Sequence, residues 1–474
     1  MMPTEEELYM ILNKNKDKAA DVKVAYIGGG SRGWAWGLMS DLAAQEELSG
    51  TVCLYDIDFD AAICNEAIGN SIKGKDFAKS NWDYKAVKSI EEALTDADFV
   101  IISILPGTFD EMESDVHAPE KYGIYQSVGD SVGPGGQFRA HRTIPMYIEI
   151  AENLKKHCPD AWVINYTNPM SLCVRTLYEV FPEIKAFGCC HEVFGTQKIL
   201  VKALEDIMDI KDVERSEIKI NVLGLNHFTW INEAYYKDID LLEVYSKFVD
   251  KYYETGFVGS EEGHWMNNSF ASAERVKFDL FLRYGVIAAA GDRHLAEFLP
   301  GNWYLKDPET VKSWNFGLTT VSFRKNELKE RLERSKRLVS GSEEFKLKET
   351  GEEGVHLMKA LLGIKDMVTN VNMPNNGQVI GVPNGVVVET NALFTKNSIK
   401  PIMAGKLPDN ILGLVHRVVM NQETILKATL AKDKKLAFTA FVNDPLVVNI
   451  SLEDAQVLFN QMFENTKEYL KGWK

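Results

Sequence analysis

Three side chains able to bind a metal stand at points of the chain where a site is plausible. Cys190 and His227 each lie in or just after a strand-like run, and Asp130 lies in a glycine-rich segment. Alone, a buried thiol or imidazole is usually a core residue, and a glycine-rich segment is often a plain surface loop. Together they form a candidate Cys/His/carboxylate site, whose mixed donors suit Mn²⁺, Fe²⁺, Co²⁺ or Zn²⁺.

A glycine pattern near the N-terminus is typical of dinucleotide binding. Its glycines, in the spacing G-x-G-x-x-G, are Gly28, Gly30 and Gly33. The first permits a tight turn, the second lets backbone amides approach a pyrophosphate, and the third lets a helix pack closely. Asp56 follows Gly28 by 28 positions. Its carboxylate can reach ribose hydroxyls and would repel a 2′-phosphate, which favours NAD over NADP. The alternative is a glycine turn that binds nothing.

The elements around these glycines determine how the loop is presented. A strand at 22–27 leads into the loop, and a helix at 34–45 leaves it with its positive end toward the phosphates. A second strand at 51–56 then ends at Asp56. Three further residues are expected to complete the cofactor site: Ser31, Arg32 and Ser103.

Strands and helices alternate through the first part of the chain, which predicts a parallel, doubly wound sheet with right-handed crossovers. Further strands are expected to begin near residues 96, 161 and 185. Ligands in such sheets bind beyond the carboxyl ends of the strands. We therefore predict an α/β fold with a Rossmann-type NAD-binding domain at 1–195. An α+β domain at 196–474 should complete the metal and substrate site, as in lactate and malate dehydrogenases.

The second part of the chain is richer in helical patterns. We expect a solvated charged helix at 325–351 and further helices at 241–253, 272–284, 409–431 and 452–470. A long β pattern covers 218–230, and a helix at 138–156 should follow the glycine-rich loop at 129–136. Because no repeat or linker separates the two parts, we expect them to pack tightly.

Two polar segments offer groups that could contact a substrate. Asn168 precedes Pro169, so it could contact sugar hydroxyls or serve as a helix N-cap, and the residues alone do not decide between these. The stretch 290–298 follows a glycine and carries four ionisable side chains: Asp292, Arg293, His294 and Glu297.

Composition narrows the class of partner. The chain has 474 residues and a net charge of −15, which argues against nucleic acid or an anionic membrane as the main partner. An anionic substrate would then need a local cluster of arginine or lysine. No secretory or transmembrane pattern is found, since residues 1–20 are polar and amphipathic. Six widely spaced cysteines fit a reducing cytoplasm better than a disulfide framework.

The ordered set of motifs resembles glycoside hydrolase family 4 along nearly the whole chain. The motifs are GGGS at 28–31, GPGG at 133–136, NYTNP at 165–169, CH at 190–191 and GLNH at 224–227. Later landmarks are PNNG at 374–377, GKLP at 405–408 and NDPL at 443–446. Each motif is weak alone, but their order is specific. This NAD-dependent family is an exception to the usual two-carboxylate scheme of glycoside hydrolysis.

The resemblance implies a redox elimination. Hydride passes from C3 of the sugar to NAD⁺, a base removes the acidified C2 proton, the aglycone leaves C1, water adds, and hydride returns. A divalent metal, commonly Mn²⁺ but also Co²⁺, Ni²⁺ or Fe²⁺, holds the C2 and C3 oxygens. A homodimer or homotetramer is expected. A malate- or lactate-type dehydrogenase is the remote alternative, and it leaves Cys190 and His227 without a role.

The resemblance also implies roles for individual residues. Cys190 and His227 resemble the two protein ligands of the metal, with Cys190 as thiolate, and Asn168 resembles the sugar-binding asparagine. Asp130 stands where the family often has a glutamate. The chain departs from the family at the C2 base, because no tyrosine occurs in the matching region. There the base is expected to be Asp292 or His294.

The residues after Cys190 indicate the substrate. His191 followed by glutamate looks most like the α-galacturonidase branch, with α-glucuronidase and α-galactosidase as alternatives. His191 could protonate the departing C1 oxygen. Arg293 is the first candidate to bind the substrate carboxylate, and it could instead be a structural ion-pair partner. Two arginines are less favoured alternatives for that role: Arg139 and Arg142.

Overall fold

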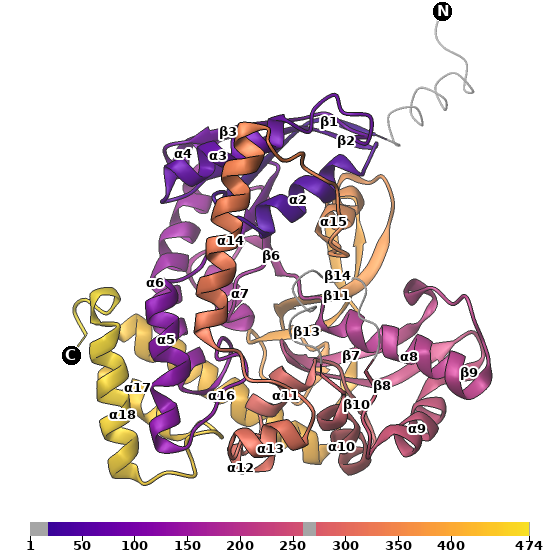
Figure 1. The fold of residues 1–474 in the computed structure, drawn as a ribbon, viewed down its shortest axis with the longest axis vertical. Coiled ribbons are helices and arrows are strands. Elements are labelled where there is room, and N and C mark those ends of the chain that lie inside the picture. The colour runs from indigo at the N-terminus through magenta and orange to yellow at the C-terminus, as the bar shows by residue number, and fades with distance from the viewer. Residues whose placement is uncertain (1–17, 259–271, 474) are drawn as a thin grey trace, which may run out of the picture.

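A computed structural model describes residues 18–258 and 272–473. A nine-stranded sheet runs through it in the order β14-β13-β11-β6-β5-β4-β1-β2-β3 (Figure 1). Its parallel strands are β1 (Ala19–Ile27), β2 (Leu48–Tyr55), β3 (Trp82–Val87), β4 (Phe99–Ile102), β5 (Trp162–Asn165) and β6 (Lys185–Gly188). The order reverses between β1 and β4, as in a Rossmann sheet. The predicted fold class is therefore confirmed.

Three strands from the second half of the chain extend this sheet beyond β6. They are β11 (Met367–Pro374), β13 (Val387–Thr395) and β14 (Ser398–Pro401). β11 pairs antiparallel with β6 where Asn372 lies opposite Gly188, and it pairs with β13 along its whole length. The two halves of the chain thus share one sheet. The domain boundary at residue 195 stays a prediction.

Helices cover both faces of the sheet, and each face has its own apolar core. The first face carries α2 (Trp34–Ala43), α3 (Phe59–Asn70) and α15 (Gly354–Leu362). The opposite face carries α4 (Ile90–Leu94), α6 (Gly133–His157) and α7 (Met170–Val180). Side chains such as Val24 on the first face and Ala25 on the second alternate along β1, which is why a doubly covered strand reads as a continuous apolar run.

A smaller sheet and a helical region complete the fold (Figure 1). The sheet comprises β7 (Lys219–Leu225), β8 (Phe228–Tyr236), β9 (Ile239–Asp240) and β10 (Ile287–Ala288). Helices α8 (Glu192–Met208), α9 (Leu241–Tyr252) and α10 (Arg275–Tyr284) pack on it. The remaining elements are α5 (Phe109–His117), α11 (Asp292–Glu297), α12 (Gly301–Tyr304), α13 (Pro308–Ser313), α14 (Val321–Ser340), α16 (Asp409–Ala431), α17 (Lys434–Val442), α18 (Leu452–Asn465), β12 (Val379–Ile380) and β15 (Gly405–Lys406). Short 3₁₀ turns cover Pro119–Tyr122, Arg215–Glu217 and Lys467–Tyr469.

The β pattern predicted at 218–230 is divided by a turn in the structure. Two antiparallel strands, β7 and β8, form a hairpin whose turn consists of Asn226 and His227. His227 has a φ of 63°, in the left-handed region that non-glycine residues adopt mainly in turns. Apolar residues on both sides conceal this turn in the sequence. The hairpin therefore lifts His227 out of the strands and presents it at one end of the smaller sheet.

Two helix boundaries also differ from expectation. The charged helix predicted at 325–351 is α14, which ends at Ser340 because Gly341 adopts a φ of 74° and caps it. The glycine-rich segment at 129–136 is only partly a loop, since α6 begins at Gly133. A Cβ on Gly136 would lie 2.5 Å from the Ser131 carbonyl carbon. These glycines thus serve close packing of the first turn of α6.

The structure also bears on the expected lack of membrane spans and of disulfides. None of the helices among the described residues has the length and apolar character needed to cross a bilayer. All six cysteines are free thiols. The polar N-terminal segment at 1–20 lies almost entirely outside the described residues.

A partly buried carboxylate joins the first half of the chain to the segment before α15. Asp41 on α2 accepts hydrogen bonds from the backbone amide of Thr350 at 2.9 Å and from its hydroxyl at 2.5 Å. Burial raises the pKa of Asp41 to about 7, although both bonds from Thr350 oppose the rise. Between the ordinary pKa of an aspartate and about pH 7, Asp41 is therefore protonated in the folded protein and ionised in the unfolded chain.

Asp41→Asn is expected to change how stability depends on pH. Between about pH 4 and pH 7 the unfolded chain binds fewer protons at this site, so the free energy of unfolding falls as pH rises. The Asp41→Asn variant lacks this decline. The difference in the free energy of unfolding, variant minus wild type, should therefore be roughly 2–4 kcal/mol larger at pH 8 than at pH 4. Urea denaturation of both proteins at the two pH values measures the difference. An unchanged difference would contradict the assigned pKa.

Candidate active site

Three side chains with metal-binding groups meet at one point of the structure. The ligand atoms of Asp130, His227 and His294 all lie within 4.8 Å of one another. Asp130 lies just before α6, His227 lies in the β7–β8 turn, and His294 lies on α11. The structure thus brings the predicted Asp130 and His227 together. It adds His294, which was expected as a base.

Hydrogen bonds and ring stacking fix this cluster. The Ser131 hydroxyl donates to Asp130 Oδ1 at 2.8 Å and lies 2.9 Å from His227 Nδ1. The imidazoles of His227 and His294 stack with their centres 3.8 Å apart and an angle of 23° between the rings. Sequence reasoning missed Ser131, whose only signal was its position beside Asp130.

Electrostatics keep the cluster in the protonation states that metal ligands need. Burial opposes ionisation of Asp130, but His227, His294 and Arg139 outweigh it and lower the pKa of Asp130 to about 2. Burial lowers the pKa of His227 to about 3 and also lowers the pKa of His294. At neutral pH the cluster therefore holds one carboxylate and two neutral imidazoles, which is the donor form a divalent cation binds.

Asn168 contacts this cluster directly. Its Nδ2 donates to Asp130 Oδ2 at 2.9 Å, and its backbone carbonyl accepts a 2.9 Å hydrogen bond from Arg139 Nε. The alternative role as a helix N-cap is wrong, because α7 has no side-chain cap. Among the described residues, the buried Asn168 Oδ1 has no hydrogen-bond partner. The acceptor capacity of this oxygen is therefore not used by the described protein groups.

Cys190 lies in the loop after β6 and is not a member of the cluster of three. It is buried, with 8% of its surface exposed. Burial, followed by the nearby charges of Glu389 and Glu192, raises the pKa of its thiol well above the ordinary value. A thiolate at this position therefore requires a compensating positive charge, such as a metal ion. Its role as a metal ligand stays a prediction.

His191 pairs with a glutamate from the distant segment before α15. His191 Nδ1 lies 3.0 Å from Glu352 Oε1, and its Nε2 lies 4.0 Å from Glu192 Oε1. Burial alone would lower the pKa of His191, but Glu352 and Glu192 outweigh it and raise that pKa. The two carboxylates thus favour the protonated form of His191.

Glu192 is a site residue that sequence reasoning missed. One of its oxygens accepts a 2.7 Å hydrogen bond from the Gly291 amide, and the other lies 3.7 Å from His294 Nδ1. Burial opposes its ionisation, but His294 and His191 outweigh it and lower the pKa of Glu192. This carboxylate lies between two imidazoles. Its adjacency to His191 was the available signal.

Asp292 does not point toward the cluster as a free base would. Its two oxygens accept hydrogen bonds from the backbone amides of Val276 at 3.2 Å and Lys277 at 3.0 Å, so it satisfies the first turn of α10. The side chain is fully buried, and burial raises the pKa of Asp292 to about 7. This geometry favours a stabilising role over proton transfer to a substrate.

Two of the three candidate arginines, Arg142 and Arg293, differ in what they contact. Arg142 forms a buried ion pair with Asp115, which occupies its charge. Arg293 Nη2 donates to the Ser127 carbonyl at 2.6 Å and to the Thr319 hydroxyl, and its Nε donates to the Gly317 carbonyl at 3.2 Å. Arg293 is thus held by contacts with two loops, and its roles as substrate ligand or ion-pair partner stay predictions.

The glycine loop at 28–33 has the geometry that its glycines predict. Gly28 has a φ of 96°, and a Cβ there would lie 2.0 Å from the carbonyl oxygen of Ser103. The Gly30 amide donates to Asp56 Oδ2 at 2.8 Å, while Asp56 Oδ1 accepts from the Asp58 amide at 2.9 Å. Glycine at position 28 is therefore a steric requirement of the fold.

Side-chain contacts from α3 and its N-cap hold the rest of the loop. Asn65 Nδ2 donates to the carbonyls of Gly29 at 2.8 Å and Ser31 at 3.0 Å. Arg32 lies 4.0 Å from Asp58, and Gly33 precedes α2. The hydrogen bonds from Asn65 thus fix the positions of the two carbonyls.

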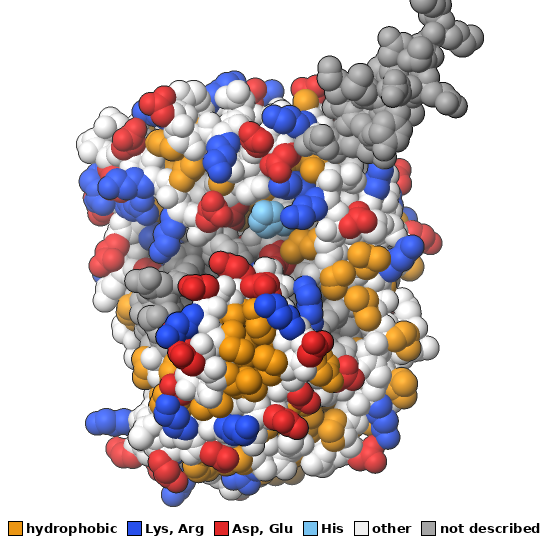
Figure 2. Space-filling model, turned by 90° about the vertical axis from the view of Figure 1, so that its right-hand side faces the viewer, with side chains coloured by type: hydrophobic (Ala, Val, Ile, Leu, Met, Phe, Trp, Pro, Cys, Tyr) orange, Lys and Arg blue, Asp and Glu red, His pale blue; other side chains and the backbone are white. Residues whose placement is uncertain are grey.

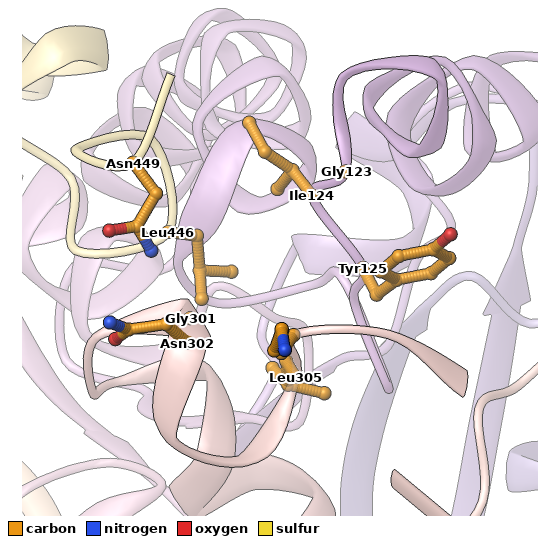
Figure 3. A pocket seen from close by; sticks show the side chains of 9 residues that line it. Gly123, Ile124, Tyr125, Gly301, Asn302, Leu305, Leu446 and Asn449 are labelled. Atoms are coloured by element: carbon orange, nitrogen blue, oxygen red, sulfur yellow. The ribbon is translucent and has the colours of Figure 1, made fainter. Parts of the chain in front are cut away.

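One face of the molecule is hollowed, and a small cavity is lined by a set of residues of its own. Figure 2 shows the molecule hollowed between its upper and lower parts, with acidic, basic and histidine side chains along the hollow. A cavity of about 100 Å³ lies elsewhere, with Asn302 and Asn449 at one end and Tyr125 at the other (Figure 3). Ile124 and Leu446 also line it, and none of the predicted site residues does.

Comparison with known proteins identifies the family. The family 4 glycosyl hydrolase pattern matches residues 23–206, and that of the family's C-terminal domain matches residues 222–447. The chain belongs to glycosyl hydrolase family 4. It is therefore a glycoside hydrolase, and the resemblance seen in its motifs is confirmed.

Relatives within family 4 are similar along the full length. The α-galacturonidase of Thermoanaerobacterium saccharolyticum is 71% identical over 96% of this chain and 98% of its own. The α-galacturonidase of Bacillus subtilis is 53% identical over 94% of this chain and 97% of its own.

Solved structures of this family share the fold. One described as a glucosidase, LplD, of B. subtilis has a TM-score of 0.88 and 53% identity, covering 94% of this chain and all of its own. A 6-phospho-α-glucosidase from gut microorganisms, solved with NAD and Mn²⁺, has a TM-score of 0.79 at 18% identity. It covers 95% of this chain and 99% of its own.

Proposed function

We propose that this family 4 enzyme is an α-galacturonidase that requires NAD⁺ and a divalent metal. The observation that carries the proposal is the 71% identity, over almost the whole chain, to an enzyme of that name. The cluster of Asp130, His227 and His294 supports the metal requirement. Six free cysteines are compatible with the reducing cytoplasm that we propose as its location.

The donor set fits a divalent cation. We propose that Cys190 and His227 hold it, with Asp130 and His294 beside them, and that it is Mn²⁺ or a similar ion such as Co²⁺, Ni²⁺ or Fe²⁺. The orphaned Asn168 Oδ1 supports this proposal, since a cation or a sugar hydroxyl would satisfy it. When bound, the ion supplies a Lewis acid that polarises sugar oxygens.

The glycine loop fits a dinucleotide. The absence of a side chain at Gly28 leaves the backbone of the loop able to approach Ser103, and Asp56 lies at the end of β2 where ribose is bound in such folds. We propose Gly30, Gly33, Ser31 and Arg32 as further contacts. When bound, NAD⁺ supplies the hydride acceptor.

Histidines supply the proton transfers in this proposal. His191 Nε2 donates a proton to the departing C1 oxygen, and Glu352 holds the ring through Nδ1. His294 is favoured over Asp292 as the C2 base, because burial keeps His294 neutral while Asp292 accepts two helix amides. Glu192 lies between the two histidines and orients them.

Arginines near Asp130 support an anionic substrate. The charges of Arg139 and Arg324 both interact with Asp130, and Arg139 is buried while Arg324 is partly exposed. Arg293 was the first candidate for the substrate carboxylate, and it remains a proposal. Its contacts with the loops at Ser127 and Gly317 favour Arg324 as the direct partner and Arg293 as a support.

Arg324→Ala is expected to lower kcat/KM for digalacturonate, because the carboxylate of the bound substrate loses its charge partner. The expected loss corresponds to about 2–4 kcal/mol. The same variant should change the activity on a neutral digalactoside little. Arg293→Ala should reduce both activities, since it loosens two loops. Equal losses on both substrates with Arg324→Ala would contradict its assignment, and a loss on digalacturonate alone with Arg293→Ala would restore Arg293 as the direct partner.

Turnover of a substrate panel tests the function itself. Digalacturonate, a neutral digalactoside, an α-glucuronide and an α-glucoside are compared with and without NAD⁺ and Mn²⁺. Cleavage of digalacturonate is expected only with both additions, without net NADH, and with solvent deuterium at C2 of the product. Preference for another sugar overturns the substrate assignment, while net NADH accumulation favours the dehydrogenase alternative. Light scattering tests the proposed homodimer or homotetramer.

A further inference from the structure

A buried carboxylate lies behind the site and has no part in the reaction described above. Glu389 on β13 is 1% exposed. It lies opposite Asn372 in the sheet, and Asn372 lies opposite Gly188 on β6. The three residues form a row across the sheet at the end of β6, from which Cys190 emerges. Glu389 is therefore placed beneath the loop of a predicted metal ligand.

Polar side chains from two strands and one turn converge on this carboxylate. Glu389 Oε1 accepts a hydrogen bond from Asn370 Nδ2 at 2.7 Å. Glu389 Oε2 accepts from Asn226 Nδ2 and from the Thr229 hydroxyl, each at 3.4 Å. A carboxylate is an unusual choice for a core position, because burying it is costly unless several donors satisfy it.

The donors connect Glu389 to both predicted metal-ligand segments. Asn370 Nδ2 also donates to the backbone carbonyl of Cys190 at 3.4 Å. Asn226 immediately precedes His227 in the β7–β8 turn. The carboxylate thus connects the loop of Cys190, on the large sheet, with the turn of His227, on the smaller sheet.

We infer that Glu389 is a positioning residue, which sets the separation of Cys190 and His227 by binding Asn370 and Asn226 on its two oxygens. Cys190 lies in a loop and His227 in a two-residue turn, so neither residue is itself inside a helix or strand. Partners behind metal ligands commonly orient them, and their loss typically lowers metal affinity about 10–100-fold. The inference rests on the proposed metal site.

Glu389→Gln tests the inference with the full chain, because it keeps the size of the side chain and removes one acceptor. Binding of Mn²⁺ alone is measured by calorimetry. Co²⁺ is used as a probe because a sulfur-to-cobalt absorption band reports the Cys190 contact. We expect about 10–100-fold weaker Mn²⁺ binding and a diminished band. Activity should return toward the wild-type kcat at saturating Mn²⁺, since Glu389 touches no reacting atom.

Asp279→Asn is the matched control. Asp279 is also a buried carboxylate, 4% exposed, and it accepts hydrogen bonds from Tyr253 at 3.1 Å and Arg283 at 2.6 Å on α10. Both variants should lose thermal stability, but only Glu389→Gln should weaken metal binding. Should Glu389→Gln fail to fold, Asn370→Ala takes its place, with about a 10-fold loss of affinity expected.

The outcomes separate the inference from the function it rests on. The positioning role alone is overturned if the wild-type protein binds Mn²⁺ and the Glu389 or Asn370 variant binds it with the same affinity and shows the same Co²⁺ band. A wild-type chain that binds neither Mn²⁺ nor Co²⁺ overturns the proposed metal site and the positioning role with it. Loss of binding in Glu389→Gln that matches the loss in Asp279→Asn also overturns the inference, because it then reflects general destabilisation.

Discussion

His227→Ala is expected to lower kcat/KM by about 10³-fold or more, because a metal that stabilises developing charge contributes several kcal/mol to catalysis. The family resemblance implies that His227 is a metal ligand, and the structure places it in the cluster with Asp130 and His294. Its ring stacks on His294 and contacts Ser131, so its removal also loosens two neighbours. Steady-state kinetics and Mn²⁺ calorimetry measure the two losses, and added Mn²⁺ should not restore turnover.

His416→Ala controls for the loss of an imidazole. His416 lies on α16, outside the cluster, where its ring contacts the carbonyl of Gly381. This variant should retain wild-type turnover. A His227→Ala enzyme with near-normal kcat/KM in chelated buffer would be incompatible with a metal at this position.

Gly30→Ala is expected to weaken NAD⁺ binding about 10–100-fold, since overpacking a close contact costs about 1–3 kcal/mol. A Cβ at position 30 would lie 2.7 Å from Ala61 Cβ and 2.9 Å from Asp56 Oδ2. The added methyl group must therefore displace α3 or the carboxylate proposed for ribose. Calorimetric titration with NAD⁺ measures the loss, and turnover should recover partly at high NAD⁺.

Gly413→Ala is the matched glycine control. Gly413 lies within α16, and a Cβ there meets nothing within 4 Å. Alanine should stabilise this helix by up to about 1 kcal/mol and leave NAD⁺ affinity unchanged. If Gly30→Ala binds NAD⁺ as tightly as this control does, the loop is not the cofactor site.

Local chemistry made much of the nucleotide-binding half predictable. Gly28 can adopt its φ of 96° and its contact with Ser103 only as glycine, so the pattern and the structure express the same steric limit. The buried strands are continuous apolar runs because helices cover both faces of the sheet. Asn168 was left between two roles, and only the fold placed its amide on Asp130.

Other features depend on contacts between distant parts of the chain. The turn at His227 lies between apolar residues on both sides, so the sequence shows no break in the strand. Asp292 and His294 are two residues apart, yet one accepts α10 amides and the other stacks on His227. Periodicity cannot separate these roles. Glu352 contacts His191 although more than 150 positions separate them in the sequence, and the residues around either one do not indicate the pair.

The pairing of β11 with β6 has a consequence for biosynthesis. The strand that covers the β6 edge is made about 180 residues later, because Asn372 pairs with Gly188. A nascent chain that has completed only the nucleotide-binding half therefore exposes an open strand edge, which can pair with another chain. Such long-range closure also raises contact order and slows folding. Productive expression thus depends on shielding one edge until the second half emerges from the ribosome.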